Sequence, residues 1–251
     1  QMINVAVCGS NGKMGKEVCL AVEECPDTEL VAKIDIASDG MYHSIDDAHR
    51  VEDIDVLVDF TQPKSIFENA KYCLNNGIKI VIGTTGLSDE QIAELKKLSQ
   101  EKNTGCLIAP NFSTGAVLMM MFAKLASKYF DNAEIIELHH NQKKDAPSGT
   151  AVSLAEVIAN VKGWDYDKDV RHGRVGNVGA RTRHEIGMHA VRGGDIVGDH
   201  TVMFAANGER VELTHKASSR DTFAKGALRA VRFLADAKPG LYDMQDVLGL
   251  K

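Results

Sequence analysis

The chain has 251 residues, of which 44% are hydrophobic and 25% charged, and it carries a formal net charge of −6. A chain of this length can bury a hydrophobic core without disulfides or metal ions. The negative charge and the lack of a basic run argue against a nucleic-acid partner, and no apolar run approaches the ~20 residues that span a bilayer. The five cysteines form no C-x-x-C pair, and a glycine-rich turn comes too early for a signal peptide. We therefore expect a cytoplasmic protein with free thiols that binds neither nucleic acid nor membrane.

The first half of the chain alternates short β-rich runs with helical patterns. A proline at position 63 suits the first turn of a helix, and Ser88 with Gln91 forms a capping-box signature. The expected strands are residues 3–8, 30–36, 56–60, 78–82 and 107–109, and the expected helices are 13–24, 63–75 and 89 to about 100. Such alternation predicts an α/β fold in which helices cover both faces of a parallel sheet.

The pattern changes after about Asn111. A long helix is expected over residues 114–129, in which the run of three methionines fills a core, and a polar, glycine-rich region spans about 163–180. Other expected elements are strands at 133–140, 183–191, 200–206 and 210–217 and helices at 150–161 and 222–235. Asn207 and Gly208 form a hairpin signal between the last two strands. This half predicts a second, α+β domain with a mainly antiparallel sheet.

A glycine-rich run with the spacing G-x-x-G-x-x-G lies between the first expected strand and helix. It comprises Gly9, Ser10, Asn11, Gly12, Lys13, Met14 and Gly15. Small residues allow a tight turn, and free N–H groups at a helix start suit a pyrophosphate. Asp35, at the end of the second strand, can accept hydrogen bonds from a ribose. The sequence therefore predicts a Rossmann-type dinucleotide site, the alternative being a structural turn with an incidental aspartate.

The residues around Asp35 bear on the choice between NADH and NADPH. A carboxylate repels a 2′-phosphate, and Ile36, Ala37 and Ser38 supply no arginine, although Lys13 or Lys33 could partly compensate. We expect NADH as the preferred cofactor, with NADPH usable.

Two further turns follow apolar strands at their carboxyl ends, where ligands gather in open α/β sheets. Residues 60–63 begin with Phe60, and residues 83–86 have the sequence Gly83-Thr84-Thr85-Gly86. We expect both turns to line the nicotinamide end of the site; the alternative is that they are ordinary turns.

The segment 137–150 carries the residues most suited to chemistry. Two adjacent histidines, His139 and His140, end an apolar strand and must point to opposite faces, so one can donate a proton while the other contacts a different part of a ligand. Ser148, Gly149 and Thr150 open a helix whose N–H groups suit a carboxylate, and Lys143 adds positive charge. The pattern predicts an anion site, the alternative being a capped helix with solvated lysines. No metal-ligand spacing is present in the sequence, and the other histidines are expected in surface or structural roles.

The chain closely resembles the dihydrodipicolinate reductase family over nearly its whole length. The resemblance rests on the glycine loop 9–15, the G-T-T-G turn 83–86 and the A-P-N-F-S segment 109–113. Residues 137–151 match the specific family signature E-x-H-H-x-x-K-x-D-A-P-S-G-T-A, and residues 192–198 and 214–220 match later motifs. Family members that favour NADPH often have arginine where Ile36 stands, which leaves the cofactor preference in doubt but not the reaction.

The resemblance implies NAD(P)H-dependent reduction of 4-hydroxy-tetrahydrodipicolinate, a small dicarboxylate, in diaminopimelate and lysine biosynthesis, by a homotetramer. It implies a cofactor domain of residues 1–109 and 220–251 and a substrate-binding and oligomerisation domain of residues 110–219. The implied catalytic residues are His139 as proton donor and Lys143, and the substrate would be bound by His140, Ser148, Gly149 and Thr150. The implied cofactor contacts are Gly9, Ser10, Asn11, Gly12, Lys13, Met14, Asp35, Phe60, Gly83, Thr84, Thr85, Ala109, Pro110, Asn111 and Phe112.

Two other functions remain as alternatives from the residues alone. One is a two-domain dehydrogenase that acts on another small amino-dicarboxylate such as aspartate, against which the H-H-x-x-K-x-D-A-P-S-G-T run argues. The other is a regulator that senses NADH without turnover, but such proteins usually carry a DNA-binding helix-turn-helix or a basic patch, and the sequence has neither.

Overall fold

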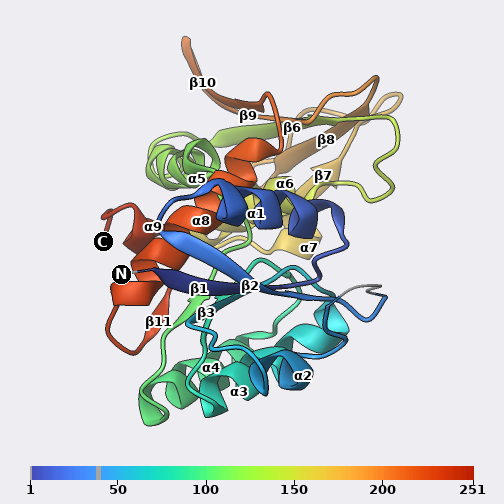
Figure 1. Cartoon of the computed structure of the whole chain (residues 1–251). Coiled ribbons are helices and arrows are strands. Elements are labelled where there is room, and N and C mark those ends of the chain that lie inside the picture. The colour runs from blue at the N-terminus through green and yellow to red at the C-terminus, as the bar shows by residue number, and fades with distance from the viewer. Residues whose placement is uncertain (1, 38–40) are drawn as a thin grey trace. The chain divides into compact units, whose positions relative to one another are not determined.

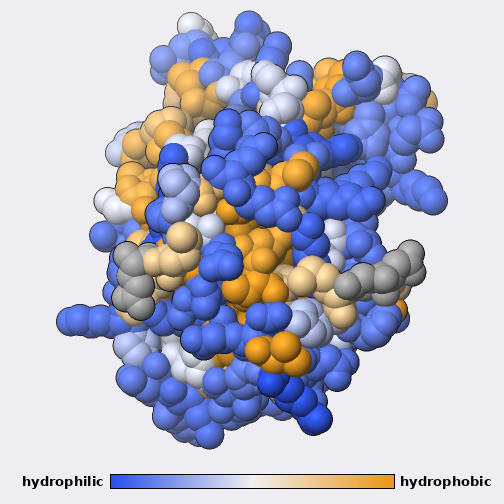
Figure 2. Space-filling view, in the orientation of Figure 1, coloured by the Kyte–Doolittle hydropathy of each residue, from blue (hydrophilic) through white to orange (hydrophobic). Residues whose placement is uncertain are grey.

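The computed structural model describes residues 2–37 and 41–251 (Figure 1), so Ser38 lies outside the described residues. The chain forms two compact units. Unit 1 comprises residues 1–113 and 220–251, and unit 2 comprises residues 114–219. Hydrophilic side chains cover most of the face seen in Figure 2. Among the described helices none is long and apolar enough to cross a membrane.

Unit 1 is built on a parallel sheet with the strand order β11-β5-β4-β3-β1-β2. Its strands are β1 (Ile3–Cys8), β2 (Thr28–Ile34), β3 (Val56–Asp59), β4 (Lys79–Ile82), β5 (Cys106–Ile108) and β11 (Leu241–Tyr242). All four residues of β3 are buried, as expected for a strand covered on both faces, which therefore has an unbroken apolar run. The predicted Rossmann-type parallel sheet is confirmed.

Helices cover both faces of this sheet: Figure 1 shows α1 and α8 on one side and α2, α3 and α4 on the other. The helices are α1 (Lys13–Glu24), α2 (Ile45–His49), α3 (Pro63–Asn75), α4 (Asp89–Glu101), α8 (Asp221–Asp236) and α9 (Met244–Val247). The predicted bounds of α1 and α3 are exact, and the capping box of Ser88 and Gln91 is formed. Elements α2, α9 and β11 were not predicted, because at two to five residues they are too short to show a periodic pattern.

Unit 2 contains a five-stranded sheet with the order β10-β9-β6-β8-β7. Its strands are β6 (Asn132–His139), β7 (Val170–His172), β8 (Ile186–Arg192), β9 (Gly198–Ala206) and β10 (Glu209–Ala217), and its helices are α5 (Thr114–Ala126), α6 (Gly149–Lys162) and α7 (Tyr166–Asp169). The expected antiparallel pairing is found for β6–β9 and for the β9–β10 hairpin. The sheet is mixed, however, because β6, β8 and β7 pair in parallel.

The core of unit 2 lies where α5 and α6 cover one face of this sheet. Ile135 of β6 and Phe204 of β9 pack there with Leu154 of α6 and Met119 of α5, all of them buried. Two of the three methionines contribute to the core as expected, Met119 inside it and Met120 packed against it, whereas Met121 is half-buried. This packing fixes β6, and with it the position of the residues that follow its carboxyl end.

Candidate active site

The glycine loop forms a tight turn at the carboxyl end of β1. Gly9 has a φ of +81°, and a Cβ on Gly9 would collide with the carbonyl oxygen of Phe60, while one on Gly15 would collide with the carbonyl oxygen of Gly9. Both positions therefore require glycine. Helix α1 begins after Gly12, where no side chain caps its first N–H groups. These groups and the positive end of the helix are available to an anion.

Asp35 follows β2 and is tied to the glycine loop. Its carboxylate accepts the backbone N–H of Asn11 at 3.0 Å and that of Ala37 at 3.0 Å, and the amide of Asn11 donates to the carbonyl of Ala37 at 3.3 Å. Asn11, which replaces the middle glycine of the common motif, thus links the two sides of the site. The hydroxyl of Ser10, in contrast, is buried and points at the carbonyl oxygen of Ile34.

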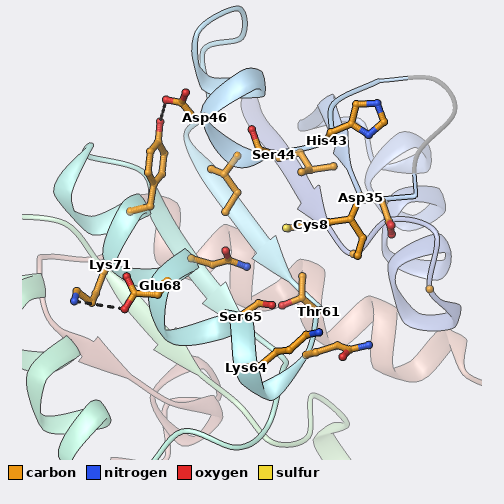
Figure 3. A pocket seen from close by; sticks show the side chains of 18 of the residues that line it. Cys8, Asp35, His43, Ser44, Asp46, Thr61, Lys64, Ser65, Glu68 and Lys71 are labelled. Atoms are coloured by element: carbon orange, nitrogen blue, oxygen red, sulfur yellow. Dashed lines mark hydrogen bonds and ion pairs between the residues drawn. The ribbon is translucent and has the colours of Figure 1, made fainter.

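A cavity of about 890 Å³ opens beside this loop (Figure 3). Gly9, Gly12 and Asp35 contribute to its wall, as do Ile36, which is 90% exposed, and Ala37. The opposite wall of the cavity was not predicted from the sequence. It comes from α3 and from the start of α2 with the residues just before it. Its members include His43, Ser44, Asp46, Lys64, Ser65, Glu68 and Lys71. Of the two lysines considered near Asp35, Lys33 pairs with Glu23 at 2.9 Å, and Lys13 is exposed on the loop.

The carboxyl ends of β3 and β4 are joined by Asp59, which is 0% exposed. Its Oδ1 accepts the N–H of Thr61 at 3.0 Å and the hydroxyls of Thr61 and Thr84, both at 2.7 Å, and its Oδ2 accepts the amide of Asn69 at 2.9 Å. The N–H of Thr61 also donates to Thr84 Oγ1 at 2.8 Å. Asp59 therefore holds both predicted turns in place, and the side chain of Thr84 is used for this purpose, whereas Thr85 is exposed.

Aromatic packing brings the turn after β5 to the same edge of the sheet. The rings of Phe60 and Phe112 lie 5.6 Å apart, and a Cβ on Gly83 would collide with the ring of Phe60. Ala109 and Phe112 are buried, Pro110 is exposed, and the side-chain oxygen of Asn111 accepts the N–H of Ser113 at 2.8 Å. The predicted cofactor residues of unit 1 thus gather at the carboxyl ends of β1 to β5.

In unit 2, β6 ends at His139 beside a buried carboxylate that the sequence analysis did not single out. Glu137 is 0% exposed, and its Oε2 accepts the Nδ1–H of His139 at 2.6 Å. The guanidinium of Arg192 on β8 donates to both carboxylate oxygens at 2.9 Å, and the backbone N–H of Ser148 donates to Oε1 at 3.0 Å. Burial alone would raise the pKa of the Glu137 carboxyl, but these hydrogen bonds outweigh it and hold that pKa below its usual value.

A buried histidine on β9 completes this cluster. His200 Nε2 lies 2.7 Å from Ser148 Oγ, and its ring packs edge-on against that of His139 with centroids 5.2 Å apart. Burial, assisted by the nearby His139, lowers the pKa of His200 to about 4, so its ring is neutral at pH 7. Ser148 Oγ also accepts the N–H of Ala151 as the cap of α6, so this hydroxyl joins His200 to the start of the helix. His200 was expected in a structural role, and it supports the start of α6 beside the candidate proton donor.

The remaining predicted residues of unit 2 follow on the loop between β6 and α6. Lys143 Nζ lies 2.8 Å from both carboxylate oxygens of Asp145, and its backbone N–H donates to the carbonyl of His140 at 3.2 Å. Gly149 and Thr150 are the first residues of α6. Across the described residues, no group of three or more histidine, cysteine or acidic side chains is placed to hold a metal ion.

A Rossmann-type unit with a glycine-rich turn, together with a unit that carries a histidine and lysine beside a helix start, defines a nicotinamide-dinucleotide-dependent oxidoreductase. Residues 3–112 match the family description "Dihydrodipicolinate reductase, N-terminus", and residues 115–248 match "Dihydrodipicolinate reductase, C-terminus". The chain belongs to the dihydrodipicolinate reductase family.

Individual relatives agree with this membership. The 4-hydroxy-tetrahydrodipicolinate reductase of Syntrophotalea carbinolica is 44% identical and aligns over 100% of both chains, and that of Chromobacterium violaceum is 43% identical over 99% of both. The dipicolinate-bound dihydrodipicolinate reductase of Paenisporosarcina sp. TG-14 superposes with a TM-score of 0.81 at 33% identity, covering 98% of this chain and 99% of that one. The aspartate dehydrogenase of Thermotoga maritima, at 12% identity and a TM-score of 0.52, shares the fold alone.

These relatives establish the reaction. The protein uses NAD(P)H to reduce 4-hydroxy-tetrahydrodipicolinate to tetrahydrodipicolinate with loss of water, a step of diaminopimelate and lysine biosynthesis. The aspartate-specific and purely regulatory alternatives are therefore set aside.

Proposed function

We propose that unit 2 binds the dicarboxylate substrate at the start of α6 and protonates it from His139, while unit 1 binds the dinucleotide through the loop 9–15 and Asp35. The observation that carries this proposal is that His139 and the N-cap residue Ser148 are hydrogen-bonded to one buried carboxylate, that of Glu137. A proton donor and a carboxylate-binding helix start are thereby held at a fixed separation. Such fixed placement is what proton transfer to a bound substrate requires.

The residues of unit 1 fit a nicotinamide dinucleotide. The glycine cradle admits no side chain at positions 9 and 15, and the uncapped N–H groups of α1 suit the pyrophosphate. Each oxygen of Asp35 accepts one backbone N–H, which leaves capacity for ribose hydroxyls. The turns held by Asp59 and the segment 109–112 would line the nicotinamide end. When bound, the reduced nicotinamide supplies a hydride to C4 of the dehydrated substrate.

The residues of unit 2 would then supply charge and a proton. One substrate carboxylate is bound by the N–H groups of Gly149 and Thr150 and by Lys143, whose positive charge also stabilises negative charge that develops during the transfer. His139 delivers a proton to C3, which suits histidine because its ordinary pKa of about 6.5 lies near neutral pH. His140 contacts another part of the ligand. Ser148 acts mainly as the cap of α6, since its hydroxyl is buried.

A crystal structure of the protein with NADH and dipicolinate, the ligand seen in the Paenisporosarcina relative, tests these placements. We expect one dipicolinate carboxylate within 3.2 Å or so of the Gly149 or Thr150 N–H and of Lys143 Nζ, with the ring beside His139 Nε2. Dipicolinate bound away from the start of α6, or a nicotinamide ring far from His139, would overturn the proposal.

For the cofactor, we propose a preference for NADH with NADPH usable. Lys64 and Lys71 lie on the far wall of the cavity beside the glycine loop, where Lys71 pairs with Glu68 at 3.6 Å. On the wall next to the loop, Asp35 is followed by the exposed Ile36 rather than by an arginine. A 2′-phosphate therefore meets negative charge at this wall. The ratio of kcat/KM for the two cofactors tests this preference; a tenfold or greater preference for NADPH would contradict it.

We further propose that the protein is a cytoplasmic homotetramer that assembles through unit 2. The strand β10 is an edge of the mixed sheet and is largely exposed; α5 exposes Phe122 and Leu125, and the turn after it exposes Tyr129. Exposed edges and apolar stripes are commonly covered in assemblies. All five cysteines are buried free thiols, which suits a reducing compartment. Light scattering should give four times the mass of one chain, and cell fractionation should place the protein in the cytosol; a monomer or a secreted protein would refute these points.

A further inference from the structure

Glu137 occupies the centre of a hydrogen-bond group that reaches His139, the start of α6 and, through Arg192 and Asp145, Lys143. It contacts His139 from the same strand, two residues away, because residues i and i+2 of a strand share a face. It contacts Ser148, the cap of α6, through the backbone. Arg192, which binds Glu137 through two nitrogens, also donates to the carbonyl of Asp145 at 2.8 Å. The carboxylate of Asp145 in turn holds Lys143.

We propose that Glu137 is a positioning residue that sets the tautomer of His139 and places a negative charge beside its ring, and that Arg192 holds the Glu137 carboxylate in place for this purpose. With Nδ1–H donated to a carboxylate, the second imidazole proton must reside on Nε2, the atom that faces away from Glu137. This inference rests on the proposed role of His139 as proton donor.

The surroundings of His139 leave its Nε2 facing β9 beside a glycine. A Cβ on Gly198 would approach to 3.0 Å from His139 Nε2, so the absence of a side chain at this position leaves the ring its room. Of the other ionisable groups nearby, His200 packs against the ring from β9, and Arg192 of β8 is paired with His139 in the sheet. Lys143 on the following loop lies close enough to His200 to act on it electrostatically. His200 is neutral at pH 7, and the other two are cations. Glu137 is therefore the anion that offsets the cost of a positive charge on His139.

A second cluster in the same unit surrounds a carboxylate with similar partners but lies apart from the candidate proton donor. Glu134, three residues earlier on β6, pairs with Arg174 at 2.6 Å, with His189 at 2.7 Å and with Arg181. It joins a loop to the sheet but contacts neither His139 nor the start of α6. The two carboxylates thus have the same kinds of partners, arginine and histidine, yet only Glu137 touches the candidate proton donor. Glu134 is the matched control for Glu137.

The test compares pH profiles of kcat in the full-length protein for the wild type, Glu137→Gln and Glu134→Gln. Because the reaction needs protonated His139, kcat falls as the pH rises past the point where the ring loses its proton. Removal of the Glu137 charge favours the neutral ring and leaves Arg192 to repel the protonated one. We expect this decline to move to lower pH by about 1 unit and the plateau of kcat to fall roughly 10–100-fold, with the KM for NADH unchanged.

Glu134→Gln should lower the melting temperature without moving the pH profile. If Glu137→Gln also changes only the melting temperature, or both variants move the profile equally, Glu137 has a purely structural role and the inference is wrong. Should Glu137→Gln fail to fold, Glu137→Asp provides the same test: it keeps the charge but shortens the side chain, so kcat should fall while the decline stays near its wild-type pH. If the pH at which kcat falls moved by as much as about 1 unit in Glu137→Asp, the charge of Glu137 would not be what sets it.

A double-mutant cycle separates this inference from the proposed function. If Glu137 acts through His139, Glu137→Gln should cost kcat little in a His139→Gln background, compared with roughly 10–100-fold in the wild type. Fully additive losses would overturn the positioning role alone. A near-wild-type kcat of the single variant His139→Gln would instead overturn the proposed function on which the inference rests.

Discussion

Each unit has a fully buried carboxylate at the carboxyl end of a central strand, and in each unit that carboxylate joins two loops. In unit 1, Asp59 is surrounded by neutral donors, the hydroxyls of Thr61 and Thr84 and the amide of Asn69. In unit 2, the partners of Glu137 include the guanidinium of Arg192 and the imidazole of His139. The topological positions are alike, but the chemistry of the partners differs.

The difference follows from what each unit has to do. The turns held by Asp59 need only a fixed shape and backbone donors to bind a cofactor, and neutral hydrogen bonds provide both at any pH near neutrality. In the mechanism that we propose, the residues around Glu137 keep a proton on a particular nitrogen of His139, which requires that a negative charge offset the positive charge of the ring. Substitutions in unit 2 should therefore change the rate and its pH dependence, whereas substitutions at Asp59 should change cofactor affinity and stability.

His139→Gln should have the largest effect. Loss of a general acid typically lowers kcat by about 10²–10⁴-fold, and the dinucleotide is bound by the other unit in our proposal, so the NADH affinity should hardly change. Steady-state kinetics that follow NADH absorbance, with substrate supplied by dihydrodipicolinate synthase, measure kcat. Binding of NADH, followed by fluorescence, serves as the control. A kcat near that of the wild type would reject His139 as the donor.

Lys143→Ala should lower kcat/KM for the substrate by roughly 10²-fold, through both kcat and KM, because a charged hydrogen bond to a carboxylate is lost in the ground state and in the transition state. The adjacent exposed Lys144 offers the control, since Lys144→Ala removes the same charge from the same loop. An effect confined to the KM for NADH, or equal effects of the two substitutions, would contradict the placement of Lys143.

His200 makes unit 2 sensitive to acid. Its pKa is about 4 in the folded chain and about 6.5 in the unfolded chain, so the unfolded chain binds an additional proton between these values. The stability from neutral, buried His200 is therefore complete above about pH 6.5 and is lost as the pH falls to about 4, by up to ~3 kcal/mol. Urea unfolding at pH 7 and pH 4.5 should show a smaller difference in unfolding free energy in His200→Gln than in the wild type, and glutamine can still hydrogen-bond Ser148. If the unfolding free energy changed equally between the two pH values in the wild type and in His200→Gln, the folded protein would not hold His200 neutral.

Asp59→Asn should have the smallest effect on turnover. The amide oxygen can still accept from Thr61 and Thr84, but the amide nitrogen then faces the donor of Asn69, at a cost of about 1–3 kcal/mol in unfolding free energy. We expect a few-fold rise in the KM for NADH and an unchanged pH profile. A displaced pH profile in this variant would remove the distinction between the two carboxylates.

Local signals in the sequence were sufficient for the elements that position the site. The glycines at 9 and 15, the capping box at Ser88 and the helix that opens after Ser148 each depend on a few neighbouring residues, and the structure forms all three. The parallel pairing of β6, β8 and β7 was missed. The chain passes from β6 through α6 and α7 before β7 begins, as in a crossover connection, but β7 has only three residues and lies in a region dominated by glycine and polar side chains.

The partners of buried polar groups were harder to predict. Arg192 lies 55 residues from Glu137 and Ser148 lies 52 residues from His200, so these contacts exist only once the sheet has formed. Glu137 alone carried a local signal: it precedes His139 by two residues in an expected strand, and the same-face rule would have placed the two side chains together. Asp59 was hidden for a similar reason, because its partner Thr84 is 25 residues away, in the turn that follows a separate strand.

The division of the chain also has a consequence for the order of synthesis. Unit 2 is continuous from residue 114 to 219, but unit 1 needs α8, with its seven buried residues, and β11, which pairs with β5. On the ribosome, the segment with His139 and Lys143 is therefore complete while the nucleotide-binding sheet still lacks an edge strand and a covering helix. Unit 1, whose first strands are synthesised before any part of unit 2, is therefore the last of the two units to be completed.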